Sequence, residues 1–150
     1  MPFWSGRVGN CLWSYAHDKA STSDWESYLA AHRRALTTAP RPTTMLTVVY
    51  QASPPNAGER KMLADMVRGS ADAILAHAMV ADTAIARGVL TALDWLVKKP
   101  FKESVFSDVR EGVRWLTTFT PELRVTEIVL AIAAAVPHDA LMPDLRNPPR

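Results

Sequence analysis

Three short polar turns hold the residues of this chain that are best suited to bind an anion or a protein partner. The first turn runs from Ser53 to Arg60 and offers a serine hydroxyl, the Asn56 amide and a guanidinium. Where a strand ends and a helix begins, free backbone N–H groups and the positive end of the helix point outward. Arg60 could add a charged contact to an anion or a carboxylate there. The alternative is that Asn56 caps the helix, Pro54-Pro55 stiffens the loop and Arg60 is solvated.

Two later polar pairs, Asp82-Thr83 and Ser107-Asp108, occupy the same place in their own strand–turn–helix units. We expect the three turns to line one edge of a sheet, and Arg87 faces either this edge or solvent. Helix capping alone also explains both pairs, because Asp, Ser and Thr are preferred N-cap residues. The expected partner or anion site consists of Ser53, Asn56, Arg60, Asp82, Thr83, Arg87, Ser107 and Asp108.

The sequence contains none of the common catalytic or nucleotide-binding motifs. Gly-x-Ser-x-Gly, the P-loop and Gly-x-Gly-x-x-Gly are all absent. None of the four histidines, which are His17, His32, His77 and His138, is followed by a second ligand at metal-binding spacing. We expect His77, which lies in an apolar run, to be a core residue. The sequence therefore nominates no catalytic residue, no metal site and no cofactor, and we expect a protein that is not an enzyme.

The composition excludes several classes of protein. The 150 residues, of which 48% are hydrophobic and 21% charged, are typical of one globular domain with a sizeable core. A net charge of +2, with the basic residues spread along the chain, argues against a nucleic-acid partner. The longest apolar run, Ile128–Pro137, is too short to span a bilayer. The first residues lack a basic region followed by a long apolar stretch, so we expect no signal peptide.

Cys11 is the single cysteine of the sequence, so no internal disulfide can form. This usage fits a reducing compartment, and we expect a cytoplasmic protein. Cys11 lies in an apolar run, which favours a buried, inert thiol over a nucleophile.

A strand, a polar turn and an amphipathic helix recur three times. Strands that alternate with helices indicate a mostly parallel sheet, whose ligands bind past the carboxyl ends of the strands. The near-continuous apolar run of the first strand predicts a central strand covered on both faces. The expected strands and helices are, in chain order, Met45–Tyr50 and Ala57–Arg68, Ala73–Ala81 and Ala84–Lys98, and Glu103–Phe106 and Val109–Phe119.

The N-terminal stretch Trp4–Ala16 predicts either a short strand pair or one strand with an irregular start, with Gly6 and Gly9 as turn points. A helix is expected to follow from Thr22. Ser23 and Glu26 have the spacing of a capping box at its start.

The C-terminal part predicts one added helix and a tail. Thr120 as cap and Pro121 at the first helical position predict a helix over about residues 121–136. We expect residues 1–137 to form a single domain. Residues 138–150, which are rich in proline, are expected to run loosely over the surface.

Five tryptophans are many for 150 residues. Trp25, Trp95 and Trp115 fall on or beside helical stripes and are expected in the core. Trp4 and Trp13 either join the core, contribute to a partner surface or line an apolar pocket. Together with the apolar stripe of the last helix, they motivate an alternative function: binding a small apolar or lipid-like ligand between the sheet and the C-terminal helix.

The stretch from Leu46 to Leu116 resembles the STAS superfamily, which includes the bacterial anti-sigma-factor antagonists and stand-alone STAS/SEC14-like proteins. The likeness covers roughly residues 4–119. The residues that carry it are the strand ending near Pro54-Pro55, Arg60, the strand ending at Ala81-Asp82, the helix segment Ala86–Leu93 with Trp95, Val105-Phe106, and Arg114-Trp115-Leu116.

The resemblance implies a small α/β domain with a mostly parallel sheet of four to five strands and helices mainly on one face. It also implies a non-enzymatic regulatory or protein-interaction role, with a protein partner that is not identified and with a homodimer as one form of assembly. In the sporulation antagonists a serine early in the helix after the central strand is phosphorylated. Here the region reads Ala52-Ser53-Pro54-Pro55-Asn56-Ala57-Gly58, and the Asp-Ser-Ser-Gly type of motif is absent, so we do not expect phosphorylation of Ser53.

Overall fold

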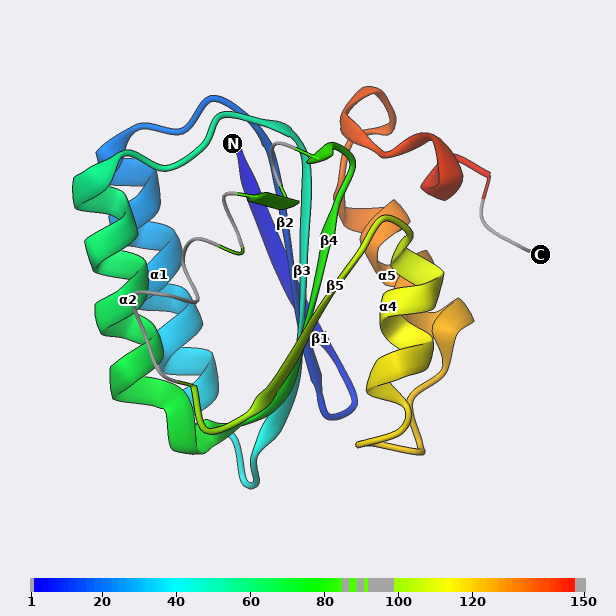
Figure 1. The fold of residues 1–150 in the computed structure, drawn as a ribbon. Coiled ribbons are helices and arrows are strands. Elements are labelled where there is room, and N and C mark those ends of the chain that lie inside the picture. Colours follow the sequence, from blue (N-terminus) through cyan, green and yellow to red (C-terminus); the bar gives the residue numbers. More distant parts are fainter. Residues whose placement is uncertain (1, 85–86, 89–90, 92–98, 148–150) are drawn as a thin grey trace.

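A mostly parallel sheet forms the centre of the molecule in the computed structural model, which describes residues 2–84, 87–88, 91 and 99–147 (Figure 1). Within these residues the sheet has five strands in the order β1-β2-β3-β4-β5. Only β1 is antiparallel to its neighbour. The strands are β1 Phe3–Val8, β2 Cys11–Asp18, β3 Thr43–Ala52, β4 Ile74–Ala81 and β5 Lys102–Phe106. The expected α/β class is confirmed, and the strand predicted at Ala73–Ala81 is confirmed as β4.

Helices cover both faces of this sheet (Figure 1). The pair α1 (Thr22–Thr37) and α2 (Ala57–Ser70) lies on one face, and α4 (Val109–Leu116) and α5 (Val125–Ala135) lie on the other. The expectation of helices mainly on one face is therefore wrong for the helices that the structure describes. The helix expected at Ala84–Lys98 lies largely outside the described residues. No helix of the described part is both long and apolar enough to cross a membrane.

The alternation of side chains along β3 explains the two helical layers. Leu46 and Val48 point to the α4–α5 side and join a large buried cluster there. Met45 points to the opposite side and joins a smaller cluster with Leu36 of α1 and Met66 of α2. A strand with apolar residues at successive positions needs cover on both faces.

The first two strands form an antiparallel hairpin, which was one of the two expected arrangements. Gly9 makes the turn in the left-handed region, with φ +54°. Gly6 is not a turn residue, contrary to expectation. It lies within β1, where a Cβ atom would come 2.7 Å from Cζ2 of Trp13. Trp13 is only 3% exposed and Trp4 is half-buried against Tyr15, so Trp13 belongs to the core.

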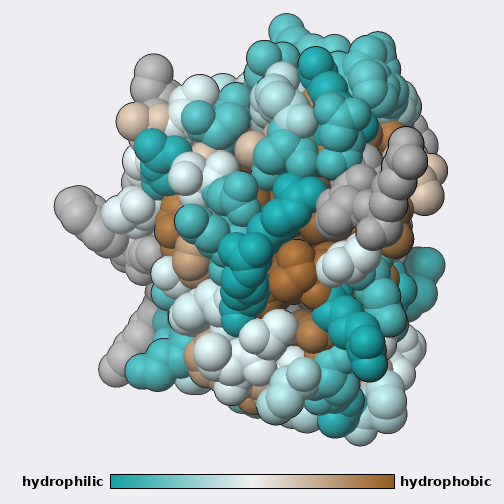
Figure 2. Space-filling view, turned by 90° about the vertical axis from the view of Figure 1, so that its right-hand side faces the viewer, coloured by the Kyte–Doolittle hydropathy of each residue, from teal (hydrophilic) through white to brown (hydrophobic). Residues whose placement is uncertain are grey.

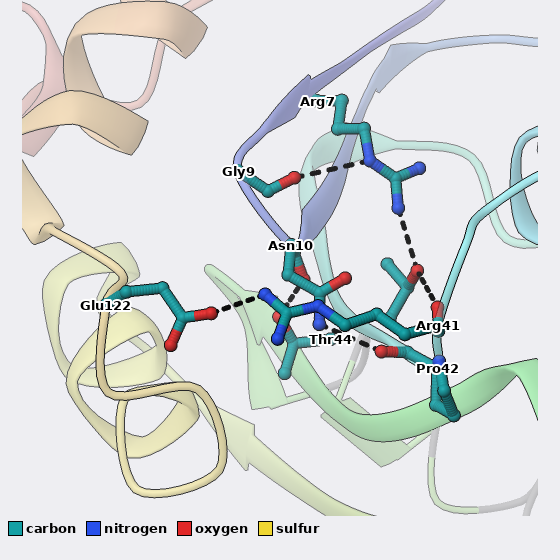
Figure 3. Close-up of polar contacts among 8 residues, drawn as sticks. Arg7, Gly9, Asn10, Arg41, Pro42, Thr44 and Glu122 are labelled. Atoms are coloured by element: carbon teal, nitrogen blue, oxygen red, sulfur yellow. Dashed lines mark hydrogen bonds and ion pairs between the residues drawn. The ribbon is translucent and has the colours of Figure 1, made fainter.

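Hydrogen bonds close the amino-terminal edge of the sheet (Figure 3). The buried Asn10 side chain donates from Nδ2 to the Pro42 carbonyl at 2.8 Å. The Asn10 carbonyl accepts from the Thr44 hydroxyl at 2.7 Å and from the Thr44 N–H at 3.1 Å. Arg41 pairs with Glu122 in the connection between α4 and α5. These contacts tie the hairpin turn to the start of β3 and leave the opposite edge for the candidate site.

Two helix starts differ from the sequence prediction. Ser21, not Ser23, caps α1, and its capping box is completed by Asp24 instead of Glu26. The last helix begins at Val125 without a side-chain cap. Thr120 belongs to a turn before it, in which the Leu123 N–H donates to the Thr120 carbonyl at 3.1 Å.

The segment after Pro137 packs into the core as far as it is described. Two 3₁₀ turns, His138–Ala140 and Pro143–Leu145, place Leu145 and other apolar residues in the cluster under α4 and α5. The buried Tyr15 hydroxyl donates to the Ala140 carbonyl and accepts from the Met142 N–H, both at 2.8 Å. The expectation that the tail runs loosely over the surface is wrong for residues 138–147.

The outer surface of the α4–α5 layer is mainly hydrophilic, with hydrophobic side chains visible near its centre (Figure 2). Leu130 of α5 is the more exposed of two large apolar residues found at the surface of the described part, at 45%. Beneath this layer, Cys11 is fully buried, and burial raises the pKa of its thiol to about 12. The expected inert thiol is thus confirmed, because a thiol with so high a pKa is not a nucleophile at neutral pH.

Candidate functional site

The predicted site residues follow the carboxyl ends of β3, β4 and β5, and we call this side of the sheet the strand-end edge. Ser53 and Thr83 are exposed there, and the Ser53 N–H donates to the Asp18 carbonyl at the end of β2, at 3.2 Å. Ser107 is also exposed, and Asp82 is half-buried. The three turns therefore share one edge, as the sequence predicted from the β-α pattern.

Capping accounts for the contacts of two of the predicted residues. Asn56 Oδ1 accepts from the Glu59 N–H at 2.9 Å, and the Glu59 carboxylate accepts from the Asn56 N–H at 3.0 Å. Asp108 caps α4 by accepting from the Glu111 N–H at 3.0 Å. The alternative weighed from the sequence, that these residues serve the helix starts, describes what both side chains do.

The two arginines of the predicted site donate to nearby backbone carbonyls. Arg60 Nη1 donates to the Pro55 carbonyl at 3.0 Å, and Arg87 Nη1 donates to the Ala81 carbonyl at 3.1 Å. Both side chains are half-buried. They brace the loop before α2 and the end of β4, so the guanidinium groups lie at the strand-end edge.

The strand-end edge divides according to the face to which each turn leads. The turn with Ser53 leads to α2, whereas the turn with Ser107 and Asp108 leads to α4 on the other face (Figure 1). On that second face, burial and then the Asp108 charge raise the pKa of Asp144. Ser53 and Thr83 both line a cavity between the sheet and the α1–α2 layer, whereas Ser107 and Asp108 do not line it.

A cavity of about 190 Å³ lies between the sheet and the α1–α2 layer. Exposed Ser53 and Thr83 line its end at the strand-end edge. Its walls are mainly apolar, with methionines from the sheet and from α2 and aromatic rings from α1 and from the segment before β5. These wall residues include Met45, Met79, Met66, Trp25, Tyr28 and Phe101. The pocket considered from the sequence lay against the C-terminal helix, which is on the other face.

A chain of hydrogen-bonded side chains crosses the sheet beside this cavity, and we call it the polar chain. Glu103 of β5 binds Lys99 Nζ through Oε1 at 2.7 Å and His77 Nδ1 through Oε2 at 2.8 Å. His77 Nε2 pairs with the Thr47 hydroxyl at 2.8 Å. The chain continues through Ser14, whose hydroxyl lies 3.5 Å from that of Thr47 and accepts from the Tyr28 hydroxyl at 2.9 Å.

The polar chain has the order hydroxyl, imidazole and carboxylate that activates nucleophiles in some enzymes. A carboxylate only accepts hydrogen bonds, so His77 holds its proton on Nδ1 toward Glu103. The Lys99 ammonium, however, offsets the negative charge of Glu103, which would otherwise stabilise a protonated, positively charged His77. The Thr47 hydroxyl also projects from the middle of a strand rather than from a strained turn. The arrangement is best suited to holding β2 to β5 together with satisfied polar groups.

His32 of α1 is a buried polar residue at this cavity whose bonding is incomplete. It lines the cavity and is 3% exposed, and its Nε2 atom is buried without a hydrogen-bond partner in the described part of the chain. Burial, and secondarily the charge of His77, lower the pKa of His32 to about 4. His32 is therefore neutral at physiological pH, with one nitrogen left available to a molecule in the cavity.

Neither the polar chain through Thr47, His77 and Glu103 nor the place of His32 at the cavity was predicted from the sequence. A signal for the polar chain existed, since Thr47 and His77 are isolated polar residues within apolar strands. Their meeting depends on register, because Thr47 lies opposite Met79 and His77 lies opposite Met45 and Glu103. Thr47 and His77 are diagonal neighbours, a relation that strand periodicity alone does not reveal.

Lowering the pH below 6.5 is expected to destabilise the fold through His32. An unfolded histidine binds a proton near pH 6.5, whereas folded His32 does so near pH 4. Between these values the unfolded state holds the extra proton, so stability falls as the pH falls, by up to about 1.4 kcal/mol per pH unit. Urea unfolding at pH 7, 6 and 5 measures this slope. The His32→Phe variant should show a flatter profile, and equal slopes in the two proteins would contradict the assignment.

Comparison with known proteins identifies the fold. No protein-family model matches the chain, and no curated protein matches it in sequence. A solved structure does match: an uncharacterised protein of the DUF3478 family from Shewanella loihica PV-4, described as having a SpoIIAA-like fold. The match has a TM-score of 0.58 and 14% sequence identity, and it covers 76% of this chain and 91% of that chain. The chain has a SpoIIAA-like fold.

The SpoIIAA-like fold confirms the STAS-like fold that the sequence resemblance implied. An identity of 14% carries no function from one protein to the other, because one fold can serve many functions. Function must therefore be argued from the strand-end edge and from the cavity of this chain.

Proposed function

We propose that this chain is a non-enzymatic regulatory or protein-interaction domain that resembles the anti-sigma-factor antagonists. The observation that carries the proposal is that the strand-end edge presents exposed Ser53 and Thr83 where the cavity ends. A partner bound at this edge would contact the start of α2, which Arg60 holds against the Pro55 carbonyl. The SpoIIAA-like fold supports the proposal by analogy.

A protein capture experiment tests the partner surface. We expect the Ser53→Ala/Arg60→Ala double variant to retain less than about a tenth of the partner captured by the wild type, since loss of a central contact weakens binding by roughly tenfold or more. The bait is the purified chain, and the sample is a native lysate of the source cells.

A matched control separates this loss from a general effect of removing a hydroxyl and a charge. Thr126 and Arg124 are exposed on and before α5, away from the strand-end edge. The Thr126→Ala/Arg124→Ala variant should capture the same partner as the wild type. Unchanged capture by the Ser53/Arg60 variant would remove the strand-end edge from the proposal.

The proposal includes a cytoplasmic location and a second copy of the chain as one candidate partner. A single, fully buried cysteine supports a reducing compartment. Native mass spectrometry of the purified protein reads its oligomeric state directly, and a monomer at all concentrations would exclude the homodimer.

A second candidate function is the binding of a small apolar ligand, and the cavity is the specific observation that favours it. Its walls are mainly apolar and include methionine and aromatic side chains, which is the usual character of a small-molecule site. Native mass spectrometry of freshly purified protein should show a reproducible extra mass. A spectrum of the ligand-free chain alone, together with no response to added apolar probes, would contradict this function.

A further inference from the structure

We propose that the cavity takes a small, uncharged molecule of about one ring in size that carries a hydroxyl group, and that this hydroxyl pairs with His32 Nε2. The inference rests on the second proposed function, ligand binding, and it adds the chemical class of the ligand and the residue that selects it.

The volume sets the size of the ligand. The cavity holds about 190 Å³. An apolar protein cavity of about 150 Å³ is large enough to bind benzene. The part of a ligand that lies inside this cavity is therefore about one six-membered ring with one or two further atoms.

The lining sets the charge of the ligand. Met45, Met66, Met79 and Trp25 contribute apolar surface. Two carboxylates lie at or beside the cavity: Asp18 lines it and is exposed, whereas Glu103 lies beside it and already binds Lys99 and His77. An ion buried among the apolar walls, away from exposed Asp18, would lose its hydration without gaining a counter-charge, so an uncharged ligand is favoured.

His32 sets the polar group of the ligand. Its Nε2 atom is buried and has no hydrogen-bond partner among the residues that the structure describes, a state that is unfavourable unless another molecule supplies a hydrogen bond. Neutral imidazole presents Nε2 either as a donor or as an acceptor, depending on its tautomer. A hydroxyl group serves both cases, because it donates one hydrogen bond and accepts others. The Thr47 and His77 side chains are bonded to each other, and Asp18, Ser53 and Thr83 are exposed, so His32 is the selecting residue in the buried part of the cavity.

The methyl groups of methionine provide the readout. Met45, Met66 and Met79 line the cavity, whereas Met62 and Met142 do not, so the chain carries its own internal controls. We would titrate ¹³C-methyl-methionine protein with p-cresol and with toluene, which differ by one hydroxyl. Both probes should shift the three cavity methyl signals and leave Met62 and Met142 in place. The affinity for p-cresol should be about 3- to 10-fold higher, the effect of one neutral hydrogen bond.

Two His→Phe variants test the role of His32. His32→Phe keeps a ring in place but removes the nitrogen, so toluene should still bind and the advantage of p-cresol should disappear. His138→Phe, at an exposed position away from the cavity, should keep that advantage. The comparison of the two probes on the wild-type protein stands even if His32→Phe does not fold.

The outcomes separate the inference from the function on which it rests. If neither probe shifts the cavity methionines, the ligand-binding function and the inference both fail. If toluene binds as tightly as p-cresol, the cavity binds apolar molecules but His32 does not select a hydroxyl, as would occur if a retained water already paired with Nε2. A p-cresol advantage that survives in His32→Phe also overturns the inference.

Discussion

Replacing Leu145 with alanine should lower the free energy of unfolding by about 2–5 kcal/mol, the usual range for a buried leucine. Leu145 is 0% exposed and belongs to the cluster between the sheet and the α4–α5 layer. The smaller side chain would lose apolar contacts and leave a cavity that the surrounding side chains only partly fill. Urea unfolding followed by tryptophan fluorescence measures the change.

The matched control for Leu145→Ala is Leu130→Ala on α5. Leu130 is 45% exposed, so the same change of atoms removes little buried surface there. It should alter the free energy of unfolding by less than about 1 kcal/mol. Equal effects of the two substitutions would mean that the C-terminal segment does not form part of the core in solution.

The docking of this segment shows why the tail could not be predicted. Its apolar residues, Leu141, Met142 and Leu145, lie between prolines and follow neither a helical nor a strand period. Local composition therefore suggests a loose chain. The segment is held by a partner far away in the sequence, the Tyr15 hydroxyl, and by Arg110, whose Nη1 donates to the Asp144 carbonyl at 2.9 Å.

The sequence and the family resemblance led to different predictions for the arrangement of the helices. The continuous apolar run of β3 predicts cover on both faces of the sheet, and the structure confirms this. The family resemblance implies helices mainly on one face, which is wrong for the described helices. Where the two expectations differed, the physical pattern of the chain's own residues was the better guide to its layers.

The candidate site was predicted only in part, for a reason that lies in strand register. The strand-end edge follows from the β-α order alone, so Ser53 and Thr83 could be placed there from the sequence. The polar chain requires knowing that Glu103 of β5 lies opposite His77 of β4. The N-cap of α1 also lies two residues before the predicted one. Ser21 and Ser23 each have an acidic residue three positions later, so the capping-box pattern fits both.

The polar chain leads to the second large effect, which is expected for Glu103→Gln. The Glu103 and Lys99 side chains are 9% and 12% exposed, and the carboxylate lies 2.7 Å from the Lys99 ammonium and 2.8 Å from His77 Nδ1. The amide has nearly the same shape but no charge, and one of its two ends donates instead of accepting. Removing one member of a buried ion pair destabilises proteins by about 3–5 kcal/mol, and we expect a loss near the lower end of this range.

An exposed pair supplies the matched control for Glu103→Gln. Arg41 and Glu122 also form an ion pair, but their side chains are 59% and 51% exposed. Water replaces such a contact readily, so Glu122→Gln should leave the urea midpoint almost unchanged. Adding Lys99→Met to Glu103→Gln should recover part of the lost stability, because the buried ammonium is then removed as well. If Glu103→Gln is as stable as the wild type, the polar chain does not hold the sheet together. In that case Glu103 and Lys99 would also not support the walls of the cavity.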